Sequence, residues 1–284
     1  MKKQNWVSTG YIGLFMAFMY APIAVLIIYS FNDAKGRTFT HFTTKWYKEL
    51  FRNEAVMDAL ITTLLVAFIA SVIATVLGTA AAIGLDKMKK TPRNIIMQLT
   101  YLPIVNPEII TGVGFMLLFV AMRGLVMRWN AVAGTNWSFE FGLLTLCLAH
   151  ITFNVPYVIL NVLPKLRQMD YSIVEAAMDL GCNPRQAFFK VAIHELKPGI
   201  MAGFLMSLTY SIDDFIVGYF TTGTKHQPLS VLIYSMTKKR VSPEINALST
   251  VMFCVVLFVL ICANLYEMHK EKQTKQKRKG GTAF

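Results

Sequence analysis

Three acidic residues lie within long apolar stretches of the sequence, where an ionised carboxylate is costly. Glu108 directly follows Pro107, and Asp213 and Asp214 are neighbours in a later stretch. A charge at the centre of a lipid bilayer costs about 2.5 to 3.5 kcal/mol even on a lenient scale. No lysine or arginine lies in the interior of these stretches to pair with the carboxylates. The simplest compensating charge is therefore a cation that passes through the protein.

Aromatic rings beside the two aspartates favour the same chemistry. The rings of Tyr210, Phe215 and Tyr219 can contact an ammonium group, each with a gain of roughly 0.5 to 2 kcal/mol. A second interpretation stays open, in which Asp213 or Asp214 caps a broken helix or holds a partner subunit. For the glutamate, exposure near the membrane surface or protonation is the alternative to cation contact.

The composition is that of a protein that crosses a membrane several times. Of the 284 residues, 55% are hydrophobic and only 15% are charged, which is too apolar for a soluble domain of this length. The net charge of +12 does not indicate nucleic-acid binding, because the basic residues are spread over loops and a terminal tail and form no patch with interleaved aromatic residues. We interpret the positive charge as a signal of membrane topology.

The sequence carries no motif that indicates catalysis. It lacks the G-x-x-x-x-G-K-[ST] loop that binds nucleotide phosphates, so the chain does not hydrolyse ATP by that route. Its four cysteines form no CxxC pair and imply neither a disulfide framework nor a zinc site. His150 is the one histidine in an apolar stretch, and we interpret it as a helix-packing hydrogen bonder. We therefore expect neither an enzyme nor a cofactor bound to this chain.

Six apolar runs predict an all-α membrane protein with six transmembrane helices. The third run is interrupted by Pro103, Pro107 and Glu108. We expect a transmembrane domain over residues 10–266, between an amino terminus of residues 1–9 and a basic, disordered tail of residues 267–284. The predicted spans cover approximately residues 10–31, 59–85, 94–122, 141–163, 198–222 and 246–266.

The distribution of basic residues predicts the orientation of these spans. Of the 28 lysine and arginine residues, 17 lie at the two termini, after the second span and around residues 171–200. The positive-inside rule places those parts in the cytoplasm. Trp46 falls in the loop between the first two spans, in a segment that predicts a helix at the membrane surface. We interpret Trp46 as an interfacial anchor, with direct substrate contact as the second interpretation.

Residues 171–200, hereafter the coupling segment, form a polar interval between two apolar runs. Ser172 and Glu175 have the spacing of a capping box, which predicts the start of a short helix. Gly181 is placed to end that helix in the left-handed conformation. Asn183 and Pro184 supply the cap and first-turn proline of a second short helix.

Within this segment, Glu175, Ala176 and Ala177, followed after three residues by Gly181, resemble the EAA loop of the membrane subunits of bacterial ABC importers. The resemblance implies a type I permease fold, in which this loop is a cytoplasmic coupling helix that docks on an ATP-hydrolysing subunit. The chain departs from the family pattern at His194, where the pattern has a proline at the exit of the second helix.

Further motifs resemble the polyamine branch of these permeases, which transports spermidine and putrescine. They are the run from Ser211 to Phe215, the run from Ser242 to Thr250, the pair Pro107–Glu108 and the stretch from His150 to Tyr157. The resemblance implies a multi-pass protein of the bacterial inner membrane that pairs with a second permease subunit. It also implies two ATP-binding subunits that hold ATP and magnesium, and a periplasmic polyamine-binding protein.

Two other functions remain open at this stage. The first is an ABC permease for another cationic or small solute. A test of whether spermidine competes with other cations for uptake would distinguish it from a polyamine permease. A secondary transporter would instead couple Asp213 and Asp214 to protons or sodium and would work without any ATPase subunit. The basic tail favours contact with anionic membrane lipid, and no nucleic-acid partner is expected.

Overall fold

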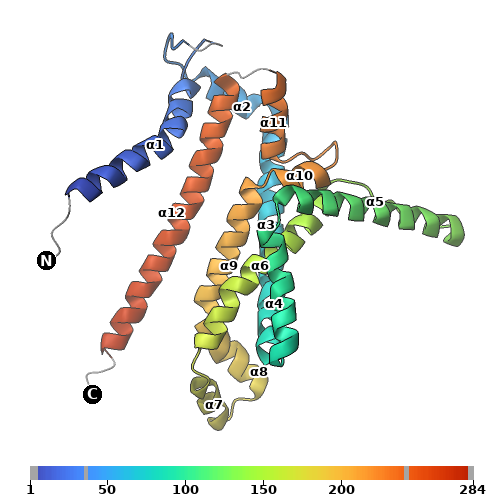
Figure 1. The fold of residues 1–284 in the computed structure, drawn as a ribbon, viewed down its shortest axis with the longest axis vertical. Helices are drawn as coiled ribbons and strands as arrows, with labels where there is room; N and C mark the ends of the chain where they lie inside the picture. The colour runs from blue at the N-terminus through green and yellow to red at the C-terminus, as the bar shows by residue number, and fades with distance from the viewer. Residues whose placement is uncertain (1–5, 35–37, 240–242, 281–284) are drawn as a thin grey trace. The chain divides into compact units, whose positions relative to one another are not determined.

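The described part of the chain is almost entirely helical. The computed structural model describes residues 6–34, 38–239 and 243–280, and its only strand-like pairing there is an isolated bridge between Asn32 and Phe42 (Figure 1). The predicted all-α class is confirmed. The elements are α1 (Trp6–Ser30), α2 (Lys45–Arg52), α3 (Glu54–Lys87), α4 (Lys90–Val105), α5 (Glu108–Ala133), α6 (Leu143–Gln168), α7 (Ser172–Asp179), α8 (Pro184–Ala187), the π-helical turn η1 (Phe188–Ala192), α9 (Ile193–Asp213), α10 (Ile216–Thr221), α11 (Leu229–Lys239) and α12 (Pro243–Gly280).

These helices divide into two compact units. The first comprises Met1–Met57 with Leu232–Val259, and the second comprises Asp58–Val231 with Leu260–Phe284. The second unit contains α3 to α10 almost completely, and with them every acidic residue singled out within the apolar stretches.

Five helices in the described residues are long and apolar enough to cross a membrane: Thr9–Ser30, Glu54–Lys87, Glu108–Ala133, Leu143–Gln168 and Pro243–Ile261. The run expected from 198 to 222 is not among them. The chain breaks at Asp214 and divides that run between α9 and α10. The count of six spans therefore stays a prediction. On Thr9–Ser30 none of the spanning window is buried within the chain.

The third predicted span, residues 94–122, was placed wrongly. The helix stops at Val105, Asn106 is extended, and a new helix starts at Glu108. Pro107 explains this break, because proline has no amide hydrogen to continue a helix and forces the residue before it out of the helical region. The new helix α5 continues to Ala133, where the loop had been expected, and ends at Gly134 with φ +66.

Both predicted domain boundaries fall inside helices. Helix α1 begins at Trp6, before the boundary at residue 9, and α12 continues through the tail to Gly280. The expectation of a disordered tail was wrong for this stretch, because lysine, glutamate and glutamine are good helix formers even without an apolar face. Residues 1–5 and 281–284 of the predicted cytoplasmic ends lie outside the described residues.

The core of the second unit depends on close approach between α3, α6 and α9. A cluster of buried side chains joins Ala74, Ala82 and Leu85 of α3 to the middle of α6. Val158 of α6 lies between two glycines. A Cβ atom at Gly78 of α3 would lie 2.6 Å from the Val158 Cβ, and one at Gly203 of α9 would lie 3.1 Å from its Cα. Small residues at such crossings let helices pack closely in lipid.

We predict that Gly78→Val destabilises the second unit, because the added side chain overlaps Val158. Overpacking of this kind costs about 1–3 kcal/mol, so the thermal midpoint of the purified protein in detergent should fall by several degrees. Gly84→Val is the matched control, since a Cβ at Gly84 on the same helix meets no atom within 4 Å. Equal midpoints for the two variants would contradict this packing.

Candidate functional site

The predicted fifth span contains a break at the two aspartates. Helix α9 ends at Asp213, Asp214 is extended with φ −63 and ψ 129, and α10 begins at Ile216. The Asp214 carboxylate accepts hydrogen bonds from the amides of Val217 at 3.2 Å and Gly218 at 2.7 Å. It therefore caps the start of α10. Of the two interpretations left open for Asp214, the cap of a broken helix is the one that the geometry shows.

The Asp214 carboxylate is buried and faces a histidine. Its Oδ2 lies 3.5 Å from Nε2 of His150 on α6, and the two side chains are only 3% and 4% exposed, respectively. The other ring nitrogen of His150, Nδ1, is 2.7 Å from the Ser211 hydroxyl. Asn154, one turn along α6, donates to the same hydroxyl at 3.1 Å. The interpretation of His150 as a helix-packing hydrogen bonder is confirmed.

Two hydroxyl groups fasten the backbone on either side of α10. Ser230 donates to the carbonyl of Asp214 at 2.7 Å, and Thr145 of α6 donates to the carbonyl of Thr221 at 2.8 Å. Both carbonyls lie where the helical hydrogen-bond ladder is interrupted, so these bonds satisfy acceptors that would otherwise be orphaned. The break is thus a built part of the second unit.

The neighbouring aspartate faces outward and belongs to a different surface. Asp213 is exposed, and Tyr210, one turn earlier on α9, stacks on Tyr157 of α6 with ring centroids 4.4 Å apart. Glu108, exposed at the start of α5, interacts electrostatically with the Tyr157 hydroxyl. We group Glu108, Tyr157, Tyr210 and Asp213 under the name acidic–aromatic face.

Sequence reasoning missed Tyr157. Its signal lay in the stretch from His150 to Tyr157, where seven residues, or two helical turns, place the two side chains on one side of α6. The other predicted rings lie on and beside α10. The ring centroids of Phe215 and Tyr219 are 5.7 Å apart, and Tyr219 is exposed. Their contact with a substrate stays a prediction.

Trp46 lies in the first unit, on α2. Its side chain is 2% exposed, and the indole N–H donates to the carbonyl of Asn32 at 2.8 Å. The Asn32 side chain in turn accepts from the amide of Thr40 and donates to the carbonyl of Thr38, so the tryptophan closes the loop after α1. This contact is internal to the chain, and a role of Trp46 in the substrate path stays a prediction.

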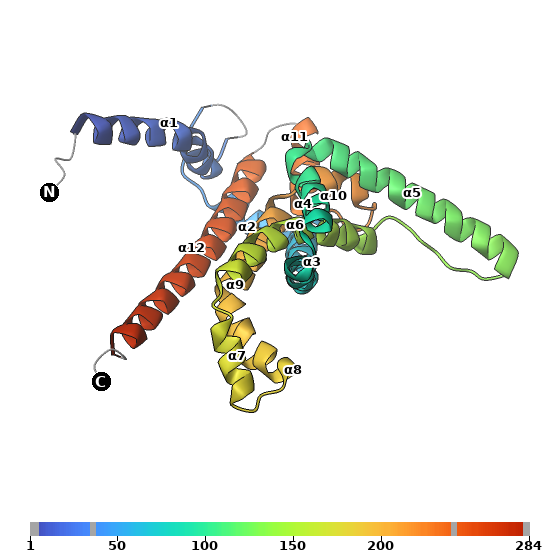
Figure 2. The ribbon, with the colours of Figure 1, turned by 60° about the horizontal axis from the view of Figure 1, so that its bottom comes forward.

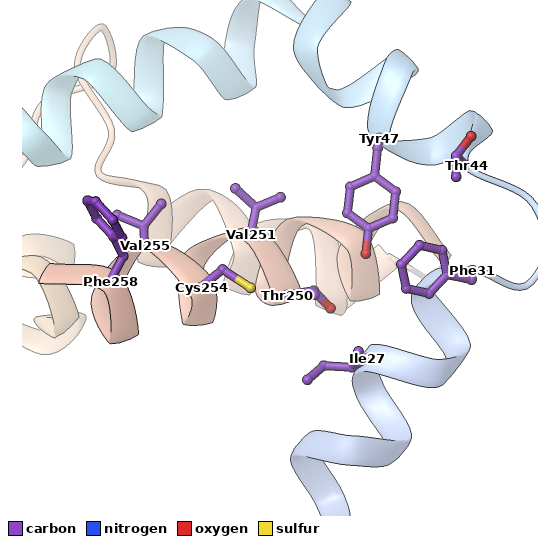
Figure 3. Close-up of a pocket in the computed structure, with 9 residues that line it drawn as sticks. All are labelled: Ile27, Phe31, Thr44, Tyr47, Thr250, Val251, Cys254, Val255 and Phe258. Carbon is purple, nitrogen blue, oxygen red and sulfur yellow. The ribbon is translucent and has the colours of Figure 1, made fainter. Parts of the chain in front are cut away.

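The first unit also contains an apolar cavity of about 730 Å³. Figure 3 shows side chains from α12 facing Tyr47 of α2 and the end of α1 across it. No charged side chain is among its lining residues, so the cavity offers an ammonium group no carboxylate to pair with. The lining residues are Ile27, Phe31, Thr44, Tyr47, Thr250, Val251, Cys254, Val255 and Phe258.

The coupling segment forms the helical corner expected from its sequence. Gly181 has φ +91, and Asn183 accepts from the amide of Gln186 at 2.9 Å while the Gln186 side chain accepts from the amide of Asn183. The predicted capping box of Ser172 and Glu175 is wrong. Ser172 is the first residue of α7, and its amide donates to the carboxylate of Asp170. A charged acceptor two residues earlier is the stronger cap, and the hydrogen bonds from Ser172 lower the pKa of Asp170.

Helix α7 lies at one end of the second unit (Figures 1 and 2). No residue of α7 is buried, and Leu180 just after it is 88% exposed. Glu175 and Ala176 are exposed and Ala177 is half-buried, so the four matched positions of the EAA pattern sit on and directly after this helix. An exposed apolar corner of this kind suits insertion into a groove on another protein.

A hydrogen bond joins α7 to the end of α3. The Tyr171 hydroxyl donates to the Asp86 carboxylate at 2.8 Å. Partial burial, with help from this bond and from the charge of Asp86, raises the pKa of Tyr171 from 10.0 to about 12. The bond thus links the start of α7 to the end of the long helix α3, which packs on α6.

Comparison with known proteins agrees with this geometry. The profile of a family described as binding-protein-dependent transport system inner membrane component matches residues 74–272, which include the helix break and the coupling segment. The chain belongs to this family. The putrescine transport system permease protein PotI of Escherichia coli strain K12 is 37% identical over 258 residues, covering 90% of this chain and 89% of the relative.

Two further comparisons extend over most of the permease chain. The spermidine/putrescine transport system permease protein PotC of the same strain is 30% identical over 264 residues, covering 93% of this chain and 94% of the relative. A solved bacterial ABC transporter involved in the import of the polysaccharide alginate matches with a TM-score of 0.70 at 15% identity, over 94% of this chain and 96% of that one. The fold is thus that of ABC importer permeases, as expected from the EAA pattern.

We predict that Tyr171→Phe loosens α7 in this permease without affecting its core. Loss of one ordinary hydrogen bond corresponds to roughly 0.5–1.5 kcal/mol, so amide hydrogen exchange in residues 172–179 should accelerate about two- to tenfold. Asp86→Asn is the milder control, since it keeps an acceptor oxygen.

The same bond sets a pH dependence. The folded chain favours the protonated phenol of Tyr171. Its contribution to the stability of the fold is therefore complete below pH 10 and is lost as the pH rises towards 12. If Tyr171→Phe leaves amide hydrogen exchange in α7 unchanged, the hydrogen bond between Tyr171 and Asp86 does not stabilise this helix.

Proposed function

We propose that the chain is a permease subunit of an ABC importer that moves polyamines, putrescine or spermidine, across the bacterial inner membrane. The observation that carries this proposal is the acidic–aromatic face, which combines two exposed carboxylates with a stacked tyrosine pair. The names of the relatives PotI and PotC support the substrate class.

The chemistry of the face suits a linear polyamine. Such a molecule has ammonium groups separated by methylene chains, and the face offers the carboxylates of Asp213 and Glu108 together with two stacked tyrosine rings. Each carboxylate can replace part of the water around an ammonium group, and the ring faces attract both the cation and the methylene chain. The exposure of the face keeps binding weak, which transport requires because a deep well would trap the solute.

The remaining parts of the importer are proposed to be supplied by partners. A second permease subunit would complete the path, and two ATP-binding subunits, holding ATP and magnesium, would dock on Glu175, Ala176, Ala177 and Gly181. The exposure of α7 supports this docking. A solved alginate transporter with its periplasmic protein, at TM-score 0.69, supports delivery by a periplasmic binding protein, here one that binds polyamines.

The orientation follows from the same assembly. We place both termini and the coupling segment in the cytoplasm, where ATP is available and where the positive-inside rule puts them. The basic tail then lies near anionic lipid headgroups. In this arrangement the chain itself transports and does not catalyse.

The proposal is tested by uptake of radiolabelled putrescine into vesicles that hold the assembled importer. Uptake should require ATP inside the vesicle, survive collapse of proton and sodium gradients, and be inhibited by spermidine more strongly than by other organic cations. Uptake driven by an ion gradient without ATPase subunits would identify a secondary transporter. If only an unrelated cation inhibited putrescine uptake, the permease would be assigned to another solute.

In the same assay we predict that Asp213→Asn raises the KM for putrescine about five- to thirtyfold, the equivalent of 1–2 kcal/mol. The loss arises because an exposed carboxylate no longer faces the ammonium group. Glu140→Gln removes an exposed carboxylate from the loop before α6 and serves as the control. Equal KM values for the two variants would remove Asp213 from the path.

The coupling segment is tested by Glu175→Arg and Gly181→Asp. Both variants should insert into the membrane normally, yet lower uptake at least tenfold relative to ATP hydrolysis, because the corner no longer fits its partner. Gly134→Asp is a matched control, since Gly134 also has a positive φ and open space around it. Normal uptake by a well-expressed double variant of Glu175 and Gly181 would count decisively against the docking role.

A further inference from the structure

Adjacent aspartates at the helix break have opposite environments. Asp213 is exposed on the acidic–aromatic face, whereas the Asp214 side chain is 3% exposed and accepts two amide hydrogen bonds of α10. Asp213 is the last residue of α9 and Asp214 is the extended residue that follows it. The two residues share one peptide bond, so the contacts that hold Asp214 act directly beside the outward carboxylate.

Helix α6 supplies a fixed reference for this break. Along the seam between α6 and α9, His150 meets Ser211, and two turns further on Val158 meets Gly203. One turn beyond that, a Cβ at Gly199 would lie 2.9 Å from the carbonyl of Asn161. Contacts this tight leave no room for α9 to slide, so the register that places Ser211 against His150 is set by the backbone.

One imidazole ring touches both sides of the break. Nδ1 of His150 is hydrogen-bonded to Ser211 in the last turn of α9, and Nε2 faces the carboxylate of Asp214, which belongs to the cap of α10. In the part of the chain that the structure describes, Nε2 has no hydrogen-bond partner, and the Asp214 carboxylate lies 3.5 Å from it. A ring nitrogen that can carry a proton, facing a buried carboxylate, is an arrangement that can compensate an acid in a membrane span.

We propose that His150 is a positioning residue for the substrate path, which acts through Asp214 to fix the direction of Asp213 on the acidic–aromatic face. The ring itself is buried and does not meet the solute. The consequence for transport rests on the proposed function, but the consequence for geometry does not.

Two conservative substitutions separate the two ring nitrogens. His150→Gln keeps a donor near the place of Nε2, towards Asp214, and gives up the bond at Nδ1. His150→Asn keeps a polar atom near the place of Nδ1, towards Ser211, and gives up the donor to Asp214. If His150 acts through Asp214, the His150→Gln variant should keep the positioning of Asp213 and the His150→Asn variant should lose it.

The direct readout is the mobility of position 213. Asp213→Cys is introduced after Cys147, Cys182, Cys254 and Cys262 are replaced by alanine, and the cysteine carries a trifluoromethyl tag for fluorine NMR on the assembled complex. We expect one narrow resonance with His150 and with His150→Gln, and at least a twofold increase in linewidth or a second resonance with His150→Asn. A tag on native Cys254, with the other cysteines replaced, should report no change in any variant.

The uptake assay provides the second readout, in proteins that retain Asp213. His150→Asn should raise the KM for putrescine about tenfold with little change in the maximal rate, while His150→Gln stays within about threefold of the parent. Asp214→Asn combined with His150→Asn should be no worse than either single variant, since both remove the same contact. Thr152→Ala, on the exposed side of α6, is the control for substitution on this helix.

The outcomes distinguish the two proposals. The positioning role would be overturned if the His150→Asn and His150→Gln variants gave equal fluorine spectra, or if His150→Asn alone kept the parent spectrum. The contact with Ser211, or the volume of the side chain, would then be enough to order position 213. Absence of putrescine uptake in the parent protein would overturn the proposed function, yet the fluorine spectra would still decide whether His150 orders the break.

Discussion

The structure of the second unit depends on compensation of one buried carboxylate. Asp214 lies in a predicted membrane span, and it is tolerated because two amides of α10 and the ring of His150 surround it. Without these partners an acid at that depth would be too costly to bury. The requirement explains why the helix breaks here. An unbroken helix would use the amides of Val217 and Gly218 in its own ladder and leave the carboxylate alone.

The same requirement gives the two adjacent acids, Asp213 and Asp214, different roles. A buried acid that is already compensated is closed to a passing cation, whereas an exposed acid without such partners is open to it. Asp214 has the first character and Asp213 the second. The acidic–aromatic face therefore combines the carboxylate that the fold leaves outside, the stacked pair Tyr157–Tyr210, and Glu108 from the start of α5.

Much of this could be predicted from the sequence, because helical periodicity and turn residues are local signals. The all-α class, the left-handed Gly181, the cap at Asn183 and the packing role of His150 all rest on a few neighbouring residues. Span boundaries were less predictable, since Pro107 decides where one helix stops while hydropathy alone runs across it. The partnership of His150 with Ser211 and Asp214 joins residues about sixty positions apart, and no local pattern reports such a contact. Ser172 showed a further limit, because a charged competitor, Asp170, took the place of the expected cap.

The short helix α10 has a consequence for the electrostatics of the path. Aligned peptide dipoles give the start of a helix a partial positive charge and its end a partial negative one. A half-helix that began at the break without a cap would therefore present positive potential to an approaching polycation. The carboxylate of Asp214 sits directly on that start and cancels it, while α9, a much longer helix, ends there with its negative pole. A discontinuity that would otherwise repel cations becomes a place of attractive potential.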